Sequence, residues 1–304
     1  MKKFVLSLYL LLTIHFLGFG QTEFTVEQNV RYLSSSQLQG RNAGTRGDSL
    51  TQLYLIQVLK QWEINPLSED YMQPFTVKMK ASRGGDYISS KNIVACIEGS
   101  DSVLKKEYII ICAHFDHVGV EKGRIHPGAN DNASGVAAVL SLANKFLRNP
   151  TKRSILIIFF GAEEKGFLGS HYFVKNPLIP LHSIVGVFNF DMVGKYKQEG
   201  FLYTKGEQTA AAFSPLIDQY AAMHQLNVEK SPYRYMDGSD HYPFYKKKIP
   251  VLFFNTGMDW DNYHKPSDLP EKIDFEGIES IAQFSFDLIS AIANKPEKIK
   301  FKKK

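Results

Sequence analysis

Acidic and imidazole side chains follow three apolar runs of this 304-residue chain, at the points where buried strands would end. His114 follows YIIICA, and Asp191 follows IVGVFNF. The adjacent pair Glu163 and Glu164 follows ILIIFFGA. In open α/β sheets the ligand crevice lies beyond the carboxyl ends of the strands. We therefore expect these side chains to meet at one edge of one sheet.

Two further candidate ligands lie in loops. Asp131 belongs to the turn PGANDNASG, which opens into a helical pattern, and His264 lies in NYHKPSD, beyond PVLFFNTG. Taken alone, Asp131 is more readily a helix N-cap, because Asp, Asn and Ser all cap helices. A histidine in such a loop often packs against neighbouring side chains without binding a metal. The acidic residues at the strand ends make a metal-binding role more plausible for both Asp131 and His264.

The pair Glu163 and Glu164 is the sharpest local signal. Two adjacent carboxylates at the end of a buried strand repel each other unless a cation lies nearby. One can bind a metal while the other works as general base and then as general acid. The alternative is an exposed turn that carries two acids. Asp116, two residues after His114, can hold that imidazole or a neighbouring group, and the sequence leaves both open.

Together these side chains supply the ligands of two metal centres that share one carboxylate. Nitrogen and oxygen donors without thiolates suit zinc, and manganese or cobalt could also occupy such a site. The motifs G-x-S-x-G, H-E-x-x-H and G-x-x-x-x-G-K-[ST] are absent from the sequence. Their absence argues against a serine hydrolase, a gluzincin and a P-loop NTPase.

Strand-like and helical patterns alternate along the second half of the chain, which predicts a mostly parallel sheet covered by helices on both faces. Earlier strands within 71–98, joined by a turn at Gly84-Gly85, would add an antiparallel edge. Asp48 is a candidate cap for an early helix that runs to about Trp62. Strands are predicted at 108–112, 154–160, 183–190 and 250–254, and helices at 25–36, 135–147, 166–174, 210–226 and 275–293.

Both ends of the chain differ from its body. Residues 1–20 have a basic start and a short apolar stretch, which predicts a secretory signal peptide cut near Gly20/Gln21, and not a retained membrane anchor. The ten residues 295–304 hold six lysines and one glutamate, and we expect a solvated, frayed tail. Without these ends the domain at 21–294 carries a net charge of −2, although the whole chain carries +5. This balance gives a nucleic-acid role little support.

The two cysteines, Cys96 and Cys112, lie in strand-like runs that could be neighbours. An exported protein could join them in a disulfide. Buried free thiols are an equal alternative, because nothing in the spacing fixes the register.

Six segments follow one another along the chain: AHFDHVG, GANDNASG, FFGAEEKGFLGS, NFDMVG, GSDHYPF and NYHKPSD. In this order they resemble the di-zinc exopeptidase family that includes aminopeptidase Y and secreted bacterial leucyl aminopeptidases. Glutamate carboxypeptidase and glutaminyl cyclase are more distant members. The resemblance covers nearly the whole mature chain and implies a three-layer α/β/α sandwich with a mixed, centrally parallel sheet.

The resemblance also implies roles for the candidate residues. One zinc would be held by His114, Asp131 and Asp191. The other would be held by Asp131, Glu164 and His264, so that Asp131 bridges both ions.

Three more residues receive roles from the resemblance. Glu163 would be the general acid/base, and Asp116 would be the carboxylate behind His114. Tyr263 matches a tyrosine that in some members steadies the tetrahedral oxyanion. The expected protein is thus an exported aminopeptidase, periplasmic or extracellular, that acts on peptides with two zinc ions. Carboxypeptidase, dipeptidase or glutaminyl cyclase activity in the same site is the alternative, and a non-catalytic binding protein is a third reading.

Overall fold

A computed structural model of the chain describes residues 24–78, 87–230 and 236–302. The expected signal peptide at 1–20 and the turn at Gly84-Gly85 lie outside the described residues. In the part of the chain that is described, none of the helices is long and apolar enough to cross a membrane.

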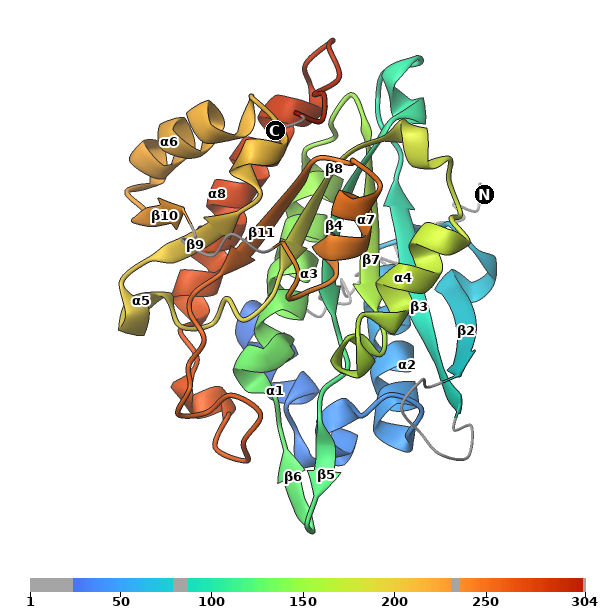
Figure 1. The fold of residues 1–304 in the computed structure, drawn as a ribbon, viewed down its shortest axis with the longest axis vertical. Helices are drawn as coiled ribbons and strands as arrows, with labels where there is room; N and C mark the ends of the chain where they lie inside the picture. The colour runs from blue at the N-terminus through green and yellow to red at the C-terminus, as the bar shows by residue number, and fades with distance from the viewer. Residues whose placement is uncertain (1–23, 79–86, 231–235, 303–304) are drawn as a thin grey trace, which may run out of the picture.

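A mixed nine-stranded sheet forms the centre of the molecule (Figure 1). Along the sheet the order is β1-β3-β7-β4-β8-β11-β9-β10, and β2 pairs with β3. The four central strands β7, β4, β8 and β11 are parallel, and the neighbours on either side are antiparallel to them. The bounds are β1 Asn65–Pro66, β2 Met72–Lys78, β3 Tyr87–Ile97, β4 Tyr108–His114, β7 Ser154–Phe160, β8 Ile184–Phe190, β9 Leu202–Lys205, β10 Val228–Lys230 and β11 Val251–Asn255.

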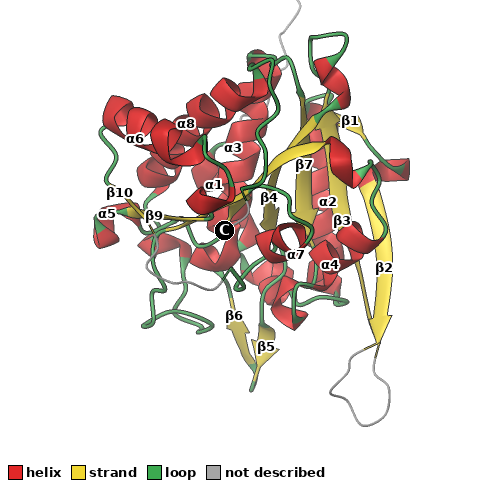
Figure 2. Ribbon diagram, turned by 45° about the horizontal axis from the view of Figure 1, so that its top comes forward, coloured by secondary structure: helices red, strands yellow, loops and turns green. Residues whose placement is uncertain are grey.

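Helices cover both faces of the sheet (Figure 2). One face carries α1 (Val26–Leu33), α2 (Arg46–Gln61), α3 (Gly135–Arg148), α6 (Phe213–His224) and α8 (Phe275–Ala293). The other carries α4 (Leu168–Lys175) and α7 (His241–Lys246). The short helix α5 (Tyr196–Glu199) and the hairpin β5 (Gly119–Glu121)–β6 (Arg124–His126) lie outside these layers. This arrangement confirms the predicted α/β sandwich.

The central strands are apolar on both sides because each side faces its own core. In β4, Ile109 and Ile111 point to the core under α3 and α8, whereas Ile110 and Cys112 point to the core under α4 and α7. All four residues are fully buried. Successive side chains of a strand alternate between faces, so a continuous apolar run is what a strand buried on both faces requires.

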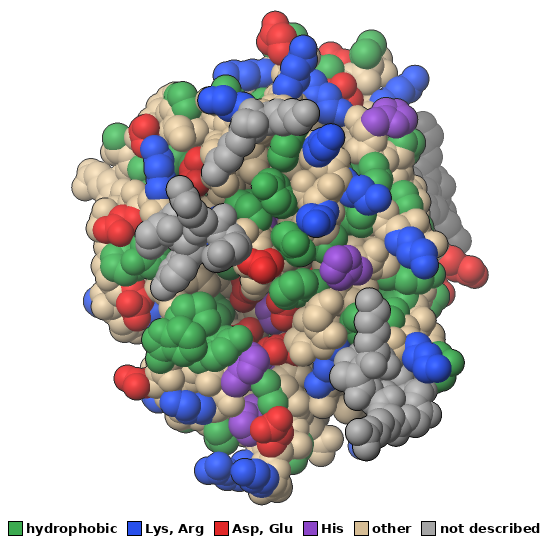
Figure 3. All heavy atoms as spheres, viewed as in Figure 1, with side chains coloured by type: hydrophobic (Ala, Val, Ile, Leu, Met, Phe, Trp, Pro, Cys, Tyr) green, Lys and Arg blue, Asp and Glu red, His purple; other side chains and the backbone are tan. Residues whose placement is uncertain are grey.

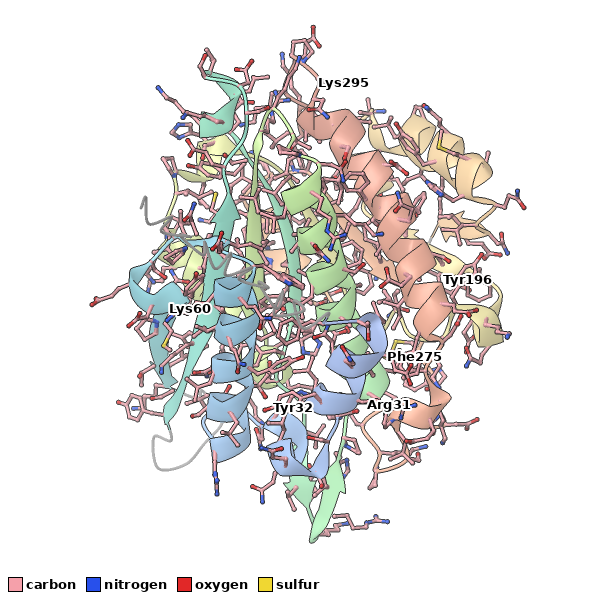
Figure 4. All side chains as sticks on the ribbon, turned by 180° about the vertical axis from the view of Figure 1, so that it is seen from behind. Arg31, Tyr32, Lys60, Tyr196, Phe275 and Lys295 are labelled. Carbon is pink, nitrogen blue, oxygen red and sulfur yellow. The ribbon has the colours of Figure 1, made fainter. Side chains whose placement is uncertain are left out.

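In the helical layer that Figure 4 shows from behind, the first helix, α1, packs near the start of the last helix, α8. Arg31 of α1 lies over the ring of Phe275, the first residue of α8, at 5.4 Å from its centroid. Thr25 caps α1 through a bond from the Gln28 amide, so this helix begins one residue after the predicted start.

Two expectations, on the cap of α2 and on the C-terminal tail, need correction, and the structure decides the open alternative for the two cysteines. Thr45, and not Asp48, caps α2, and the Asp48 carboxylate instead accepts from the Gly44 amide at 2.9 Å. Cys96 and Cys112 are free thiols, because β7 lies between their strands and separates them. The C-terminal segment is not frayed as far as Lys302, since Phe301 pairs with Ala210 and the Lys302 amide donates to the Thr209 carbonyl at 2.8 Å.

Candidate metal centre

The predicted ligands come together at the carboxyl ends of β4, β7, β8 and β11. On the face shown in Figure 3, acidic and histidine side chains gather in a hollow above the β5–β6 hairpin. His114 is the last residue of β4, and Asp191 directly follows β8. The parallel centre of the sheet therefore brings together residues that are far apart in the sequence.

One group of donors consists of His114, Asp131 and Asp191, all buried. The Nε2 atom of His114 lies 3.5 Å from Asp131 Oδ1 and 3.4 Å from Asp191 Oδ1. Its Nδ1 atom faces the backbone carbonyl of Asp116 at 3.1 Å. That contact fixes the ring so that Nε2 points to the two carboxylates.

A second group shares Asp131 and adds Glu164, His264 and His117. His264 Nε2 lies 3.1 Å from both Asp131 Oδ2 and Glu164 Oε2. His117 Nδ1 lies 3.0 Å from Glu164 Oε1 and 3.7 Å from Asp131 Oδ2. Asp131 thus lies between the two groups, with one oxygen toward each.

The sequence reasoning missed His117. The available signal was the second histidine of AHFDHVG, three residues after His114. This histidine lies in a loop beyond the end of β4, where the sequence has no periodicity to indicate where its side chain points.

Glu163 lies beside the first group, with Oε2 4.0 Å from His114 Nε2. Its carboxyl group is largely buried, and burial raises its pKa well above the ordinary value. Glu164 differs. Burial alone would raise its pKa, but hydrogen bonds with His117 and His264 and the charges of nearby imidazoles hold the pKa well below its usual range. Two adjacent glutamates therefore occupy opposite electrostatic environments.

Asp116 holds the turn that carries both glutamates. Its carboxylate accepts from the amides of Glu163 at 2.9 Å and Glu164 at 3.3 Å. The same carboxylate lies 3.9 Å from His114 Nδ1. Burial raises its pKa to about 7. Of the two partners that the sequence left open, the neighbouring turn makes the shorter contacts.

Asp131 is not the cap of α3. The Asn132 side chain accepts from the Gly135 amide at 2.9 Å and so performs the capping that the sequence pattern suggested for Asp131. The Asp268 carboxylate in turn accepts from the amides of Asn130 and Asp131, the latter at 3.1 Å. These contacts leave the Asp131 carboxylate free to face the two histidine groups.

Left-handed backbone is found at three turns of the centre. Ala162, Met192 and His264 have φ values of 57°, 57° and 54°. For residues other than glycine this conformation is costly, and such residues cluster where a site is held in place by its surroundings. The His264 carbonyl accepts from His126 Nδ1 at 2.9 Å, which ties the His264 loop to β6.

Aromatic rings line the exposed side of His264. The Tyr263 ring stacks on the His264 ring with 3.9 Å between centroids, and Trp260 packs edge-on against Tyr263 at 6.0 Å. Trp260 is 70% exposed. Burial also raises the pKa of the Tyr263 hydroxyl, so this group is neutral and a hydrogen-bond donor at neutral pH.

Residues 92–289, more than half of the chain, match the family described as Peptidase family M28. The chain belongs to peptidase family M28. This result confirms the resemblance to zinc-dependent exopeptidases that the sequence segments indicated.

Other members and neighbours of this M28 chain agree with that assignment. Aminopeptidase YwaD of Bacillus subtilis is 29% identical over 225 residues, which are 71% of this chain and 46% of YwaD. The chain spans less than half the length of the curated relatives that it matches.

Two solved structures confirm the fold. A zinc aminopeptidase from Bacillus subtilis superposes with a TM-score of 0.70 at 17% identity, over 92% of this chain and 98% of that one. Fimbriiglobus ruber glutaminyl cyclase superposes with a TM-score of 0.73 at 19% identity, over 90% of this chain and 96% of that one.

The donor chemistry of this M28 chain fits divalent metal ions. Buried carboxylates are paired with imidazoles that are themselves buried or half-buried. Burial alone would lower the pKa of His264, but hydrogen bonds to Asp131 and Glu164 raise it to about 10. A proton on His264 thus balances the acids where a cation would otherwise do so. Imidazole nitrogen and carboxylate oxygen are ligands that zinc accepts.

Proposed function

We propose that the chain is an exported, zinc-dependent aminopeptidase that removes N-terminal residues from peptides. Two zinc ions would be bound, one by His114, Asp131 and Asp191 and one by Asp131, Glu164 and His264. The observation that carries the proposal is the pair of donor groups that share Asp131, with Glu163 directly beside them.

Zinc, when bound, polarises a carbonyl oxygen and lowers the pKa of water. The remaining work falls to side chains of the chain itself. Glu163 accepts a proton from the attacking water and later donates it to the leaving amine. Burial raises the pKa of Glu163 above the ordinary value for a carboxyl group, and a raised pKa suits a group that must both accept and donate a proton. Tyr263 can donate its hydroxyl proton to the developing oxyanion.

Replacement of the proposed base tests this function. We expect Glu163→Gln to lower kcat on aminoacyl-p-nitroanilides about 10²- to 10⁴-fold, the usual contribution of general acid–base catalysis. Because Glu163 is not one of the proposed ligands, zinc content measured by elemental analysis should stay at the wild-type level. Glu229→Gln, on the exposed edge strand β10, is the matched control and should keep full activity. Equal activity of the Glu163→Gln and wild-type enzymes would exclude the proposed role.

Other reactions of the same site are separated by the choice of substrate. An aminopeptidase requires a free N-terminus, whereas a carboxypeptidase requires a free C-terminus and also cleaves peptides whose N-terminus is blocked. Release of free amino acids from dipeptides alone would indicate a dipeptidase. Peptides that begin with glutamine would lose ammonia without hydrolysis if the chain were a cyclase. Inactivity on the whole panel, with no zinc bound, would instead support a non-catalytic binding protein.

We further propose that residues 1–20 direct export to the periplasm or the medium and are removed. The basic start and apolar stretch of this segment support the proposal. Mass spectrometry of the protein recovered from cell fractions tests it. The expected result is a chain that begins near Gln21 and lies outside the cytoplasm, with no stable membrane anchor.

A further inference from the structure

We propose that His117 is a fourth protein donor to the metal position formed by Asp131, Glu164 and His264, so that the two metal positions are unequal. One position is then filled by four protein donors, and the other has only three. This inference rests on the proposed two-metal function and assigns a different task to each ion.

The four side chains of the first position are arranged around one point. His117 Nδ1, His264 Nε2 and one oxygen each of Asp131 and Glu164 all lie within 4.8 Å of one another. Two nitrogens and two oxygens make a complete tetrahedral set for zinc. Closed sets of four protein ligands are typical of tightly held ions, whereas catalytic positions keep a place for solvent.

The His117 ring is held in the orientation that coordination needs. It is fully buried and meets the His264 ring edge-on, with 5.4 Å between centroids. It also packs closely on the backbone of Gly128, where a side chain would collide with it. The His117 amide donates to the Arg41 carbonyl at 3.3 Å. Nδ1 therefore points to the acids, while Nε2 has no hydrogen-bond partner among the described residues.

A buried imidazole with a single partnered nitrogen is unusual for a purely structural histidine. Buried polar atoms are normally hydrogen-bonded, and exceptions call for a functional explanation. The Nδ1 atom itself faces oxygens of Glu164 and Asp131, and ionised carboxylates cannot donate a hydrogen bond, so a proton on Nδ1 or a metal cation must lie between the ring and these acids. Gly128 contributes by having no side chain, which lets the ring approach the turn that carries Asp131.

The second position keeps three protein donors, namely His114, Asp131 and Asp191. Glu163 lies next to this group, with Oε2 4.0 Å from His114 Nε2. The place left for solvent is thus on the side of the general base. We infer that the reacting water is received at the His114 side, and that the ion at the His117 side mainly organises Asp131 and Glu164.

Cobalt titration of the metal-free protein tests this inference, because tetrahedral Co²⁺ absorbs visible light far more strongly than Co²⁺ with five or six ligands. We expect the first equivalent added to the wild type to give the strong tetrahedral spectrum. In His117→Ser the first equivalent should give a weak spectrum. Its affinity, measured by chelator competition, should fall more than about 100-fold, beyond what the loss of an outer partner costs.

Two variants serve as controls. Asp191→Asn should lower the affinity for the second equivalent of Co²⁺, and the first equivalent should still give the strong tetrahedral spectrum. His182→Ser, an exposed histidine before β8 at the opposite end of the sheet, should change neither equivalent.

A cysteine at the same position keeps the test decisive if the serine variant does not fold. In His117→Cys a thiolate bound to Co²⁺ gives an intense near-ultraviolet charge-transfer band, and we expect this band with the first equivalent. An unchanged first spectrum and affinity in His117→Ser, or no such band in a folded His117→Cys, would show that His117 only hydrogen-bonds to Glu164. Failure of the wild type to bind any Co²⁺ or Zn²⁺ would instead overturn the proposed function itself.

Discussion

At the scale of single residues, burial and hydrogen bonds give chemically identical groups different properties. Glu163 and Glu164 are adjacent, yet burial raises the pKa of Glu163, whereas contacts with His117 and His264 keep that of Glu164 low. Titratable groups whose pKa values are pushed apart mark the acid and base of a site. This contrast supports Glu163 as the proton carrier and Glu164 as the ligand.

His241 should make the protein sensitive to acid. Its ring packs on Phe253 at 4.7 Å, and burial lowers its pKa to about 3. In the unfolded chain a histidine has a pKa of about 6.5. The folded pKa is the lower one, so the contribution of His241 to stability is complete above pH 6.5 and is lost as pH falls toward 3.

Between pH 7 and pH 5 this loss amounts to about 2 kcal/mol of unfolding free energy. We expect His241→Phe to remove this pH-dependent loss. Measured by urea unfolding, the unfolding free energy of the variant should therefore fall by about 2 kcal/mol less between pH 7 and pH 5 than that of the wild type. Parallel pH profiles of the two proteins would contradict the assignment. Burial raises the pKa values of Asp116 and Asp240 to about 7, so these two acids stabilise the folded state as the pH falls. Both are present in the wild type and in His241→Phe, so their effect cancels in the comparison.

The sequence predicted most of the centre because its residues stand at strand ends. His114, Asp191 and the two glutamates could be placed from apolar runs alone, whereas Asp131 and His264 needed the whole set. His117 lies in a loop that leaves β4, and no periodicity indicates where such a side chain points. Only the packing of that loop against Gly128 and Arg41 brings it to the acids.

At the scale of elements, a single buried arginine connects the loops that carry the ligands. The Arg41 guanidinium donates to the carbonyls of Phe115 at 2.8 Å, Pro127 at 2.6 Å and Gly128 at 2.9 Å, and also to Leu33. These bonds link the loop after β4 to the turn before α3. Burial lowers the Arg41 pKa to about 10, so it remains charged at neutral pH and is attracted by the nearby acids.

We expect Arg41→Met to lower the unfolding free energy by about 3–5 kcal/mol, because it leaves several buried carbonyls without donors. Urea unfolding of the metal-free protein measures the change. Metal affinity should fall as well, since both ligand loops lose their common anchor. Arg41→Lys, with one compact ammonium group, should recover only part of the loss. If Arg41→Met unfolded with the same urea midpoint as the wild type, this anchoring role would be ruled out.

Element bounds were predictable where burial was complete. The strand at 154–160 and the helix at 275–293 match β7 and α8 residue for residue, because their apolar patterns are continuous or regular. The short strands β5, β6, β9 and β10 were missed, since they are partly exposed and lack a distinctive pattern. The position of β7 between β3 and β4 could not be predicted either, because strand order depends on long-range pairing.

At the scale of the whole molecule, the metal centre and the C-terminal segment lie at opposite ends of the sheet (Figure 1). The centre is at the carboxyl ends of the central strands. Residues 298–301 lie near the start of β8 and β11, where Ile299 approaches Gly186 and Lys298 donates to the His182 carbonyl. The described lysines of this segment, Lys295, Lys298, Lys300 and Lys302, therefore lie away from the proposed substrate site.

Removal of residues 297–304 should therefore affect stability without affecting catalysis. The truncated protein loses the pairing of Phe301 with Ala210, the packing of Phe301 near Tyr245 and the burial of Ile299. Partial burial of two large apolar side chains, reduced by the entropy of ordering the segment, corresponds to about 1–3 kcal/mol. We expect unfolding at lower urea concentration, with unchanged kcat and zinc content. The double variant Lys300→Gln/Lys302→Gln removes charge only and should stay within about 0.5 kcal/mol of the wild type. A truncated protein with wild-type stability would mean that the segment is not docked in solution, and a loss of activity with folding intact would mean that it reaches the site.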